Sequence, residues 1–365
     1  MMVIREINGK QVAVDTNKGS SIFLKKEDLD NFGINPNCCS LNDIELCLKG
    51  NSEVVPFELT WELTNRCNLN CPFCYIHNHT HCNDISFDTA KPYIDEMIDL
   101  GLVRATLTGG ECTLNKDFKT IYKYLKEKGV LVDVYTNGIM IGDDIISLFD
   151  EFPPNRVEMT IYNSFDAQPA PFETALKLQE RHINVLVKFT VTTTTFPYFE
   201  EVQNWCTTNN LSFKFDTDIT DAFDNSSTSK YQIDLESKIK LDKIRAKNTR
   251  PKKKMLCFSC GAGNVSFHIN SHFELGLCCR DKDRFSLLNT SFTKCYSDMV
   301  EKIMMFKNKP YINCTACFAK SICRICYLRS NKIKWPTGSV SVEVPSEFCK
   351  KTQEYYKMLF PDNVW

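Results

Sequence analysis

The sequence lacks a charge imbalance, a long apolar run and the start typical of a secreted protein. Lysine and arginine number 44 against 45 acidic residues, so the net charge of −1 gives no global attraction to nucleic acid or to an anionic membrane. No apolar run reaches the roughly 18 residues of a membrane span. The opening residues 1–6 also lack the apolar core of a signal peptide. We therefore expect a cytoplasmic protein with no nucleic-acid partner and no membrane partner.

Cysteine, in contrast, is abundant. The 365 residues include 19 cysteines, an odd number in a long chain without a secretion signal, which argues against a disulfide scaffold. Scattered cysteines pack as small apolar residues, and we interpret Cys112, Cys206 and Cys295 in this way. Cysteines clustered at short spacings are more typical of metal ligands. The clusters therefore carry the functional argument.

Residues 56–220 alternate between predicted strands and predicted helices. Six strands with crossover helices require a parallel sheet, and six units fall short of a closed eight-fold barrel. The pattern predicts an α/β fold, a curved partial (β/α)6 barrel with ligands at the carboxyl ends of its strands. The expected strands are 57–63, 104–108, 130–136, 157–162, 185–192 and 211–215, and the expected helices are 87–100, 117–128, 143–149, 172–181 and 198–208.

Three further segments flank this barrel. Residues 1–55 form a small β-rich unit, in which 10–15 and 20–25 alternate around a turn and predict a hairpin. Residues 221–255 read as a linker followed by a helix over 235–247. Residues 256–365 are rich in cysteine and contain few long periodic segments, which is typical of a region that folds around metal.

The first cysteine cluster follows the first predicted barrel strand. Cys67, Cys71 and Cys74 have the spacing Cys-x3-Cys-x2-Cys. Three thiolates bind three irons of a [4Fe–4S] cube and leave the fourth iron open to a small chelating molecule. A zinc knuckle is the alternative, and it needs a fourth ligand. The residues available for that role are His77, His79, His81 and Cys82.

This loop, with Phe73 before its third cysteine, resembles the signature of the radical S-adenosylmethionine enzymes. The resemblance implies that the open iron binds the amine and carboxylate of S-adenosylmethionine. It further implies that the reduced cluster cleaves this cofactor to a 5′-deoxyadenosyl radical, which abstracts hydrogen from the substrate. By the same resemblance, Phe73 and Tyr75 line the adenine pocket.

Other residues at the ends of the predicted strands match the same family. Gly109, Gly110 and Glu111 end the second strand as a glycine-glycine-glutamate motif. The glycines would let the backbone approach the ligand, and the carboxylate would accept a hydrogen bond from the methionyl ammonium. A bare Gly-Gly more often marks a turn. Its place one strand after the cysteine loop favours the functional interpretation.

Three residues on the following strands complete the implied cofactor site. Asn137 lies in a Thr-Asn-Gly turn that borders the ribose in this family, although an Asn-Gly turn alone has the same appearance. Thr160 matches a position with a hydroxyl near the methionyl carboxylate, and Lys188 would be a charge partner there or a solvated lysine. We expect all three beside the bound cofactor.

The C-terminal cysteines resemble the SPASM extension of these enzymes, which implies two auxiliary [4Fe–4S] clusters. A zinc ribbon is the alternative for this block. Two spacings depart from the family pattern, and they leave Cys278 and Cys326 open, with Cys279 as a rival for Cys278. The resemblance assigns one cluster to Cys314, Cys317, Cys323 and Cys349, and the other to Cys257, Cys260, Cys278 and Cys326.

The resemblance covers roughly residues 57–355 and extends to peptide-modifying maturases. It implies hydrogen abstraction from a ribosomally made peptide to install an oxidative crosslink (thioether or C–C) or a related modification, with flavodoxin or ferredoxin as electron donor. Residues 1–55 would be a truncated leader-peptide-binding element that captures an extended peptide by β-augmentation, or a simple cap on the barrel. The alternatives are an epimerase with Cys112 as hydrogen donor, an anaerobic sulfatase-maturating-type enzyme, and a non-catalytic iron–sulfur scaffold.

Overall fold

The computed structural model describes residues 2–7, 10–15, 20–24, 58–76, 84–219, 222, 226–247, 262–263, 266–307, 314, 317–321, 323, 326, 328, 330–334 and 340–360. The chain divides into two compact units. The first comprises Met1–Gln232 and Gly261–Ser297, and the second comprises Ile233–Cys260 and Asp298–Trp365.

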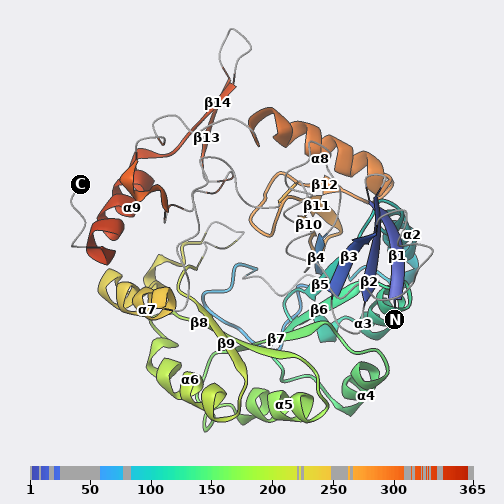
Figure 1. Ribbon diagram of the computed structural model, residues 1–365, viewed down its shortest axis with the longest axis horizontal. Helices are drawn as coiled ribbons and strands as arrows, with labels where there is room; N and C mark the ends of the chain where they lie inside the picture. Colours follow the sequence, from blue (N-terminus) through green and yellow to red (C-terminus); the bar gives the residue numbers. More distant parts are fainter. Residues whose placement is uncertain are drawn as a thin grey trace. The chain divides into compact units, whose positions relative to one another are not determined.

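Six parallel strands in chain order form the centre of the first unit, as predicted (Figure 1). Hydrogen bonds join each strand to the next one in the sequence, the pattern that short crossover helices produce. The strands are β4 (Glu58–Glu62), β5 (Arg104–Thr108), β6 (Leu131–Thr136), β7 (Arg156–Ile161), β8 (Val185–Thr190) and β9 (Ser212–Asp216).

The sheet extends beyond these six strands on the β4 side. β10 (Ser266–Ile269) pairs parallel with β4, and β11 (Glu274–Gly276) and β12 (Phe285–Ser286) follow in antiparallel order. The sequence placed these residues in the separate cysteine-rich region that starts at 256. They group with the barrel instead, because β10 supplies hydrogen-bond partners to an edge of β4 that would otherwise be open.

Helices follow the barrel strands, close to their predicted positions. They are α2 (Phe87–Asp99), α3 (Phe118–Glu127), α4 (Asp143–Glu151), α5 (Pro169–Glu180) and α6 (Phe199–Thr208). Ser86 caps α2, since its side chain accepts from the Thr89 backbone N–H at 3.3 Å. Short 3-10 turns occur at η2 (Cys112–Leu114), η3 (Phe196–Tyr198) and η4 (Ser229–Tyr231).

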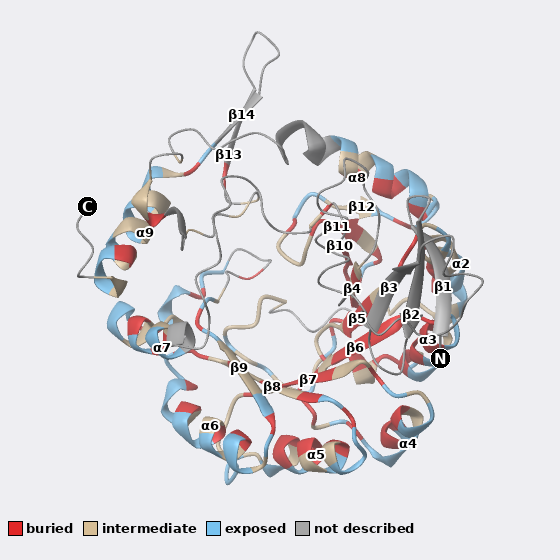
Figure 2. Cartoon of the chain, viewed as in Figure 1, coloured by how far each residue is buried: buried red, intermediate tan, exposed pale blue. Residues whose placement is uncertain are grey.

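Apolar and polar side chains alternate along the strands, so one face of the sheet is apolar and the other is polar. On β4, Leu59 and Trp61 are buried, and Ile94 and Met97 of α2 are fully buried as well. Side chains of the other parity are polar, such as Glu62 on β4 and Glu158 on β7. Figure 2 shows the resulting pattern, with buried strands and helices that are buried on one side and exposed on the other. A sheet face of polar residues is therefore left for chemistry.

An additional three-stranded antiparallel sheet lies at the start of the chain. It contains β1 (Met2–Ile7), β2 (Lys10–Asp15) and β3 (Ser20–Leu24) in that order. The predicted hairpin is confirmed, because Asp15 pairs with Ser20 and Gln11 with Leu24. The first strand was not predicted.

The second unit contains α7 (Leu235–Lys247), as predicted, and η5 (Phe318–Ser321), β13 (Asn331–Lys334), β14 (Val340–Glu343) and α9 (Ser346–Leu359). The Tyr355 hydroxyl of α9 donates to the Asp242 carboxylate of α7. The long helix α8 (Phe292–Lys307), which begins in the first unit, was not expected in the cysteine-rich region. Among the described helices, none has the length and hydropathy needed to cross a membrane.

Candidate functional site

The loop that follows β4 carries Cys67, Cys71 and Cys74, all partly exposed. Two hydrogen bonds shape it: the Leu69 N–H donates to Cys67 Sγ at 3.4 Å, and the Cys74 N–H donates to the Cys71 carbonyl at 3.0 Å. The loop starts at the carboxyl end of a parallel strand, where α/β sheets place their ligands. The predicted location of the three cysteines is thus observed.

The three thiols lie close enough to affect one another electrostatically. Burial raises the pKa of the Cys71 thiol to about 12, and the neighbouring Cys74 and Cys67 thiolates contribute to the rise. Negative sulfurs gathered in this way are costly unless cations neutralise them, which iron ions would do. In the part of the chain that the structure describes, no three Cys, His, Asp or Glu side chains are placed to hold a single metal ion. A cube has a different requirement, because each thiolate binds its own iron.

The alternative zinc knuckle depends on a fourth ligand that follows the loop. His77, His79, His81 and Cys82 lie outside the described residues. That alternative therefore stays a prediction.

Gly109 and Gly110 bring the end of β5 against the start of the cysteine loop. The Gly110 N–H donates to the Thr64 carbonyl at 2.8 Å, and the Glu111 N–H donates to the Arg66 carbonyl at 2.8 Å. A Cβ on Gly109 would lie 2.3 Å from Thr64 O, and one on Gly110 would lie 2.3 Å from Arg66 O. The glycines are therefore required for contact between two backbone segments, whereas the sequence suggested approach to a ligand.

The Glu111 carboxylate is fully buried and holds this end of the barrel together. Its Oε1 accepts from the Thr136 hydroxyl at 2.9 Å and from the Thr113 hydroxyl at 2.8 Å, and its Oε2 accepts from the Asn137 N–H at 2.8 Å. Glu111 thus connects β5 to the turn after β6. Direct contact between this carboxylate and a methionyl ammonium stays a prediction.

Substitution of Glu111 should separate its structural role from its charge. Glu111→Ala leaves several buried donors without an acceptor, so we expect the free energy of unfolding to fall by about 2–3 kcal/mol. In Glu111→Gln the amide oxygen accepts from Asn137 and the amide N–H groups donate to the two hydroxyls, but the Thr113 N–H, which donates to Oε1 at 3.3 Å, loses its acceptor, so the loss should be smaller, about 1 kcal/mol. Urea unfolding under anaerobic conditions measures both. Equal losses in the two variants would contradict this assignment.

Asn137 connects the turn after β6 to the cysteine loop. Its side-chain amide donates to Asn68 Oδ1 at 2.7 Å and lies 4.0 Å from Cys67 Sγ, and its Oδ1 accepts from the Ile139 N–H at 3.0 Å. The side chain is 6% exposed. Asn137 therefore supports the first cysteine, and its predicted contact with the ribose remains untested.

Thr160 and Lys188 face each other across β7 and β8, at the same end of the barrel. Lys188 Nζ lies 3.4 Å from Asp216 Oδ2 and 3.9 Å from Glu158 Oε1, so the lysine already has acidic neighbours. These contacts show that the two residues share one face of the sheet, while their roles toward a cofactor stay predictions.

Aromatic residues contact the cysteine loop from two other elements. The Phe73 ring lies 5.7 Å from the ring of Tyr162, at the end of β7, and 6.2 Å from that of Tyr231 in η4. Burial raises the pKa of Tyr162, and the three cysteine thiolates raise it further. Tyr162 is thus a residue of the site that the sequence did not identify as functional, although its place at the end of a barrel strand is a usable signal.

Tyr75 faces a buried pair of residues instead of open space. Its hydroxyl donates to Glu62 Oε1 at 2.7 Å, and His268 Nε2 lies 3.1 Å from the same oxygen. Burial alone would raise the pKa of Glu62, but the hydrogen bonds from His268 and Tyr75 bring it below its ordinary value. The sequence indicated neither Glu62 nor His268. The adenine contacts predicted for Phe73 and Tyr75 stay predictions.

Cys112 does not fit the role of hydrogen donor. The side chain is 0% exposed, and its thiol donates to the Tyr135 carbonyl at 3.3 Å. A donor of hydrogen to a substrate radical has to reach the substrate, so the structure favours the packing role. Cys206 and Cys295 are likewise buried, as expected of packing residues.

Four of the predicted auxiliary ligands gather in the second unit. Burial raises the pKa of the Cys314 thiol, and the thiolates of Cys349, Cys323 and Cys317 raise it further. Cys349 lies in the first turn of α9, and the Gln353 amide of that helix donates to Cys317 Sγ at 3.8 Å. These four cysteines are one of the two predicted ligand sets, and their role as cluster ligands stays a prediction.

The other predicted set is only partly described. Cys257 and Cys260 lie outside the described residues. Cys278 and its rival Cys279 are partly exposed and belong to the first unit, whereas Cys326 belongs to the second. The ligand set of this cluster stays a prediction.

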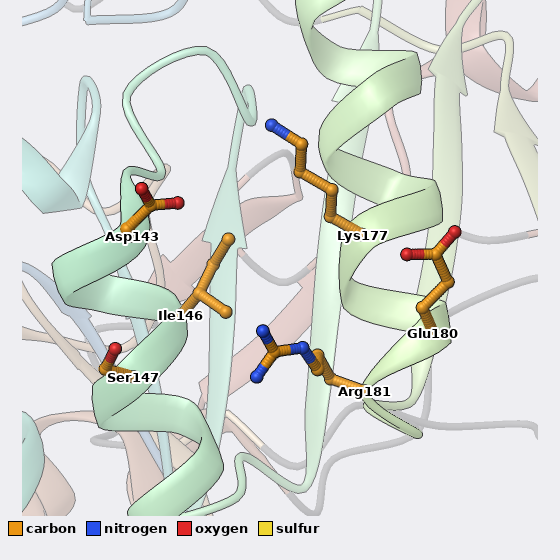
Figure 3. A pocket seen from close by; sticks show the side chains of 6 residues that line it. All are labelled: Asp143, Ile146, Ser147, Lys177, Glu180 and Arg181. Carbon is orange, nitrogen blue, oxygen red and sulfur yellow. The ribbon is translucent and has the colours of Figure 1, made fainter.

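A surface cleft lies away from the cysteine loop. It has a volume of about 270 Å³ and separates α4 from α5 (Figure 3). Charged side chains of both signs line it, and the salt bridge from Arg181 to Asp150 lies beside it. The cleft contains no cysteine and does not belong to the site. Its lining residues are Asp143, Ile146, Ser147, Lys177, Glu180 and Arg181.

Comparison with known proteins agrees with this geometry. The Radical SAM superfamily model matches residues 61–195, which include the cysteine loop and the strands up to β8. Fe-coproporphyrin III synthase of Methanosarcina barkeri is 28% identical over 145 residues, 36% of either chain. The sporulation killing factor maturation protein SkfB of Bacillus subtilis is 26% identical over 163 residues, which are 42% of this chain and 40% of SkfB. The chain thus spans little more than a third of the length of these relatives.

A solved structure shares the fold over most of the chain. Streptococcus suis SuiB bound to S-adenosylmethionine has a TM-score of 0.66 at 14% identity, with 90% of this chain and 94% of SuiB covered. SuiB bound to its precursor peptide SuiA gives a TM-score of 0.63 at 15% identity over the same shares. At this level of identity the likeness shows a common fold.

Proposed function

Because the chain belongs to the radical SAM superfamily, through residues 61–195, we propose that it is a peptide maturase that cleaves S-adenosylmethionine and removes hydrogen from a ribosomally made peptide. The product would carry an oxidative crosslink, thioether or C–C, or a related modification. The observation that carries the proposal is the cysteine loop, whose three thiols gather at the carboxyl end of β4.

The residues around this loop have the roles that such a reaction requires. Cys67, Cys71 and Cys74 would hold a [4Fe–4S] cluster, which supplies the electron that cleaves S-adenosylmethionine. Glu111 and Asn137 hold the loop in place from β5 and from the turn after β6. The polar barrel face would then position the reacting carbon.

Auxiliary clusters would complete the reaction. Removal of two hydrogens needs an electron acceptor after the first abstraction, and the grouped Cys314, Cys317, Cys323 and Cys349 support one such cluster in the second unit. A second cluster at Cys257, Cys260, Cys278 and Cys326 completes the proposal. A flavodoxin or ferredoxin would reduce the first cluster.

Two observations support a peptide as substrate. SkfB is named as the maturation protein of a sporulation killing factor, and SuiB has been solved with a precursor peptide. In the N-terminal sheet, β1 and β3 are the two outer strands, and each has one neighbour among the described strands. Strand edges of this kind bind extended peptides by β-augmentation, so we propose the sheet as a leader-peptide site.

The alternatives differ in their products. An epimerase would exchange one hydrogen, but the structure gives Cys112 no access as its donor. A sulfatase-maturating-type enzyme would oxidise a Cys or Ser side chain, and a scaffold would perform no cleavage. The relative named Fe-coproporphyrin III synthase adds a porphyrin as an outcome to test.

The proposed function predicts a defined pair of products. Under anaerobic conditions with strong reductant, we expect the enzyme to release 5′-deoxyadenosine and to lower the mass of its peptide by about two units, the mass of two hydrogens. The natural peptide is sought among short reading frames beside this gene, and mass spectrometry gives the result.

Other results would point elsewhere. An unchanged mass with one deuterium gained from heavy water would indicate epimerisation. Turnover only of a sulfatase-derived peptide or of a porphyrin would replace the peptide-crosslinking proposal. If the protein binds iron but releases no 5′-deoxyadenosine, the proposal that it cleaves S-adenosylmethionine is wrong.

A further inference from the structure

A hydrogen-bonded series of four polar side chains starts at the cysteine loop, and its two central members, Glu62 and His268, are buried. We call it the buried relay, and it consists of Tyr75, Glu62, His268 and Arg284. Tyr75 and His268 meet at Glu62 Oε1, at 2.7 and 3.1 Å. Arg284 Nη1 lies 3.1 Å from His268 Nδ1, and Arg284 Nη2 donates to the Cys278 carbonyl at 3.1 Å. The relay therefore runs from the residue after Cys74 to the segment that carries Cys278 and Cys279.

The contacts of the relay assign a donor and an acceptor role to the two ring nitrogens of His268. Arginine has only donors, so the imidazole nitrogen that faces Arg284 has to accept and carries no proton. The other nitrogen, Nε2, then carries the proton and donates to Glu62. The Glu62 carboxylate therefore accepts from two donors.

Burial of polar side chains costs free energy, and the fold could form without these polar side chains. Glu62 is 2% exposed and His268 is 1% exposed. Backbone hydrogen bonds already pair β10 with β4, where His268 faces Thr60. Apolar residues of similar volume in place of buried ionic groups are often neutral or stabilising. A polar relay at this point therefore needs another reason.

We propose that the buried relay positions the cysteine loop relative to the segment that carries Cys278 and Cys279. Each hydrogen bond in the relay has a defined donor and a defined acceptor, so the Tyr75 hydroxyl has to point at Glu62. Because Tyr75 follows Cys74 directly, this hydrogen bond also restricts the position of Cys74. This inference rests on the proposed function, because it assumes a cluster at Cys67, Cys71 and Cys74. Tyr75, Glu62 and His268 are positioning residues that act through the loop.

Substitutions of His268 test the inference. His268→Leu removes both hydrogen bonds of the ring, and we expect 5′-deoxyadenosine formation to fall about tenfold or more at unchanged iron content. The electron paramagnetic resonance spectrum of the reduced first cluster with S-adenosylmethionine should change as well. His268→Gln offers one donor and one acceptor, the two roles that the imidazole ring has in the relay, and should restore both the rate and the spectrum. His272→Leu, at an exposed position between β10 and β11, is the matched control.

Several results would overturn the inference. A wild-type rate and spectrum in His268→Leu would do so, and so would a His268→Gln variant as impaired as His268→Leu. If His268→Leu fails to take up iron, Tyr75→Phe removes only the hydroxyl at the other end of the relay. Wild-type behaviour of that variant would also refute the proposal. A wild-type protein that binds iron and releases no 5′-deoxyadenosine contradicts the proposed function instead, and the cluster spectrum of the variants then decides on the relay.

Discussion

Replacement of Cys67, Cys71 and Cys74 together by alanine is expected to abolish release of 5′-deoxyadenosine. The three thiols gather in one loop, and the variant loses all three thiolates that would hold the irons of the cube. The variant should contain about four irons fewer than the wild type, because one cube holds four. Iron analysis after anaerobic reconstitution and chromatographic detection of 5′-deoxyadenosine measure the two effects.

The matched control removes cysteines that the structure buries away from the loop. Cys206 is 0% exposed and Cys295 is 3% exposed. The double variant Cys206→Ala, Cys295→Ala should keep its iron and its cleavage activity, with a modest loss of stability from the small cavities. Release of 5′-deoxyadenosine by the triple variant would refute the central proposal. If the control also loses iron, the iron content reflects general destabilisation of the protein and does not identify the cluster ligands.

The barrel could be predicted from the sequence because its strands and helices repeat a simple pattern. Apolar strands such as Val185–Thr190 alternate with amphipathic helices, and each crossover determines the next neighbour in the sheet. β10 could not be found in this way. It has four residues, one of them His268, and its partner β4 lies some two hundred residues earlier in the chain. Pairing over such a separation leaves no local signal.

The site was predictable where residue type and strand end coincide. The cysteine loop and Glu111 follow consecutive parallel strands, so the sequence alone places them together. The contacts of Glu111 and of the two glycines could not be inferred from the sequence. They depend on the distance between the backbone at the end of β5 and the backbone at the start of the cysteine loop. The buried relay is the extreme case, since a lone histidine in an apolar strand is more often an ordinary core residue than a member of a functional network.

Gly110→Ala is expected to damage the site as severely as the loss of the cysteines. A Cβ at this position would lie 2.3 Å from Arg66 O and 2.7 Å from Asn65 O, and both atoms belong to the backbone that leads into the cysteine loop. A backbone at this distance cannot move aside as a flexible side chain does, so the loop has to shift. We expect a loss of stability of about 3 kcal/mol, at the upper end of overpacking effects, and loss of the first cluster.

Gly142→Ala provides the control for this substitution. A Cβ there would lie 3.1 Å from Asp144 Oδ1, an exposed side chain that can rotate, and the backbone φ of −89° suits alanine. Gly142 is the N-cap of α4, a position that favours glycine over alanine, so we expect this variant to keep its iron and its 5′-deoxyadenosine formation with a loss of stability below about 1 kcal/mol. Measured together by iron analysis and urea unfolding, the two variants separate contact with the cysteine loop from the general effect of an added methyl group. If Gly110→Ala retains the first cluster, the close contact between the Gly109–Glu111 turn and the cysteine loop is not required for the site, and the prediction is wrong.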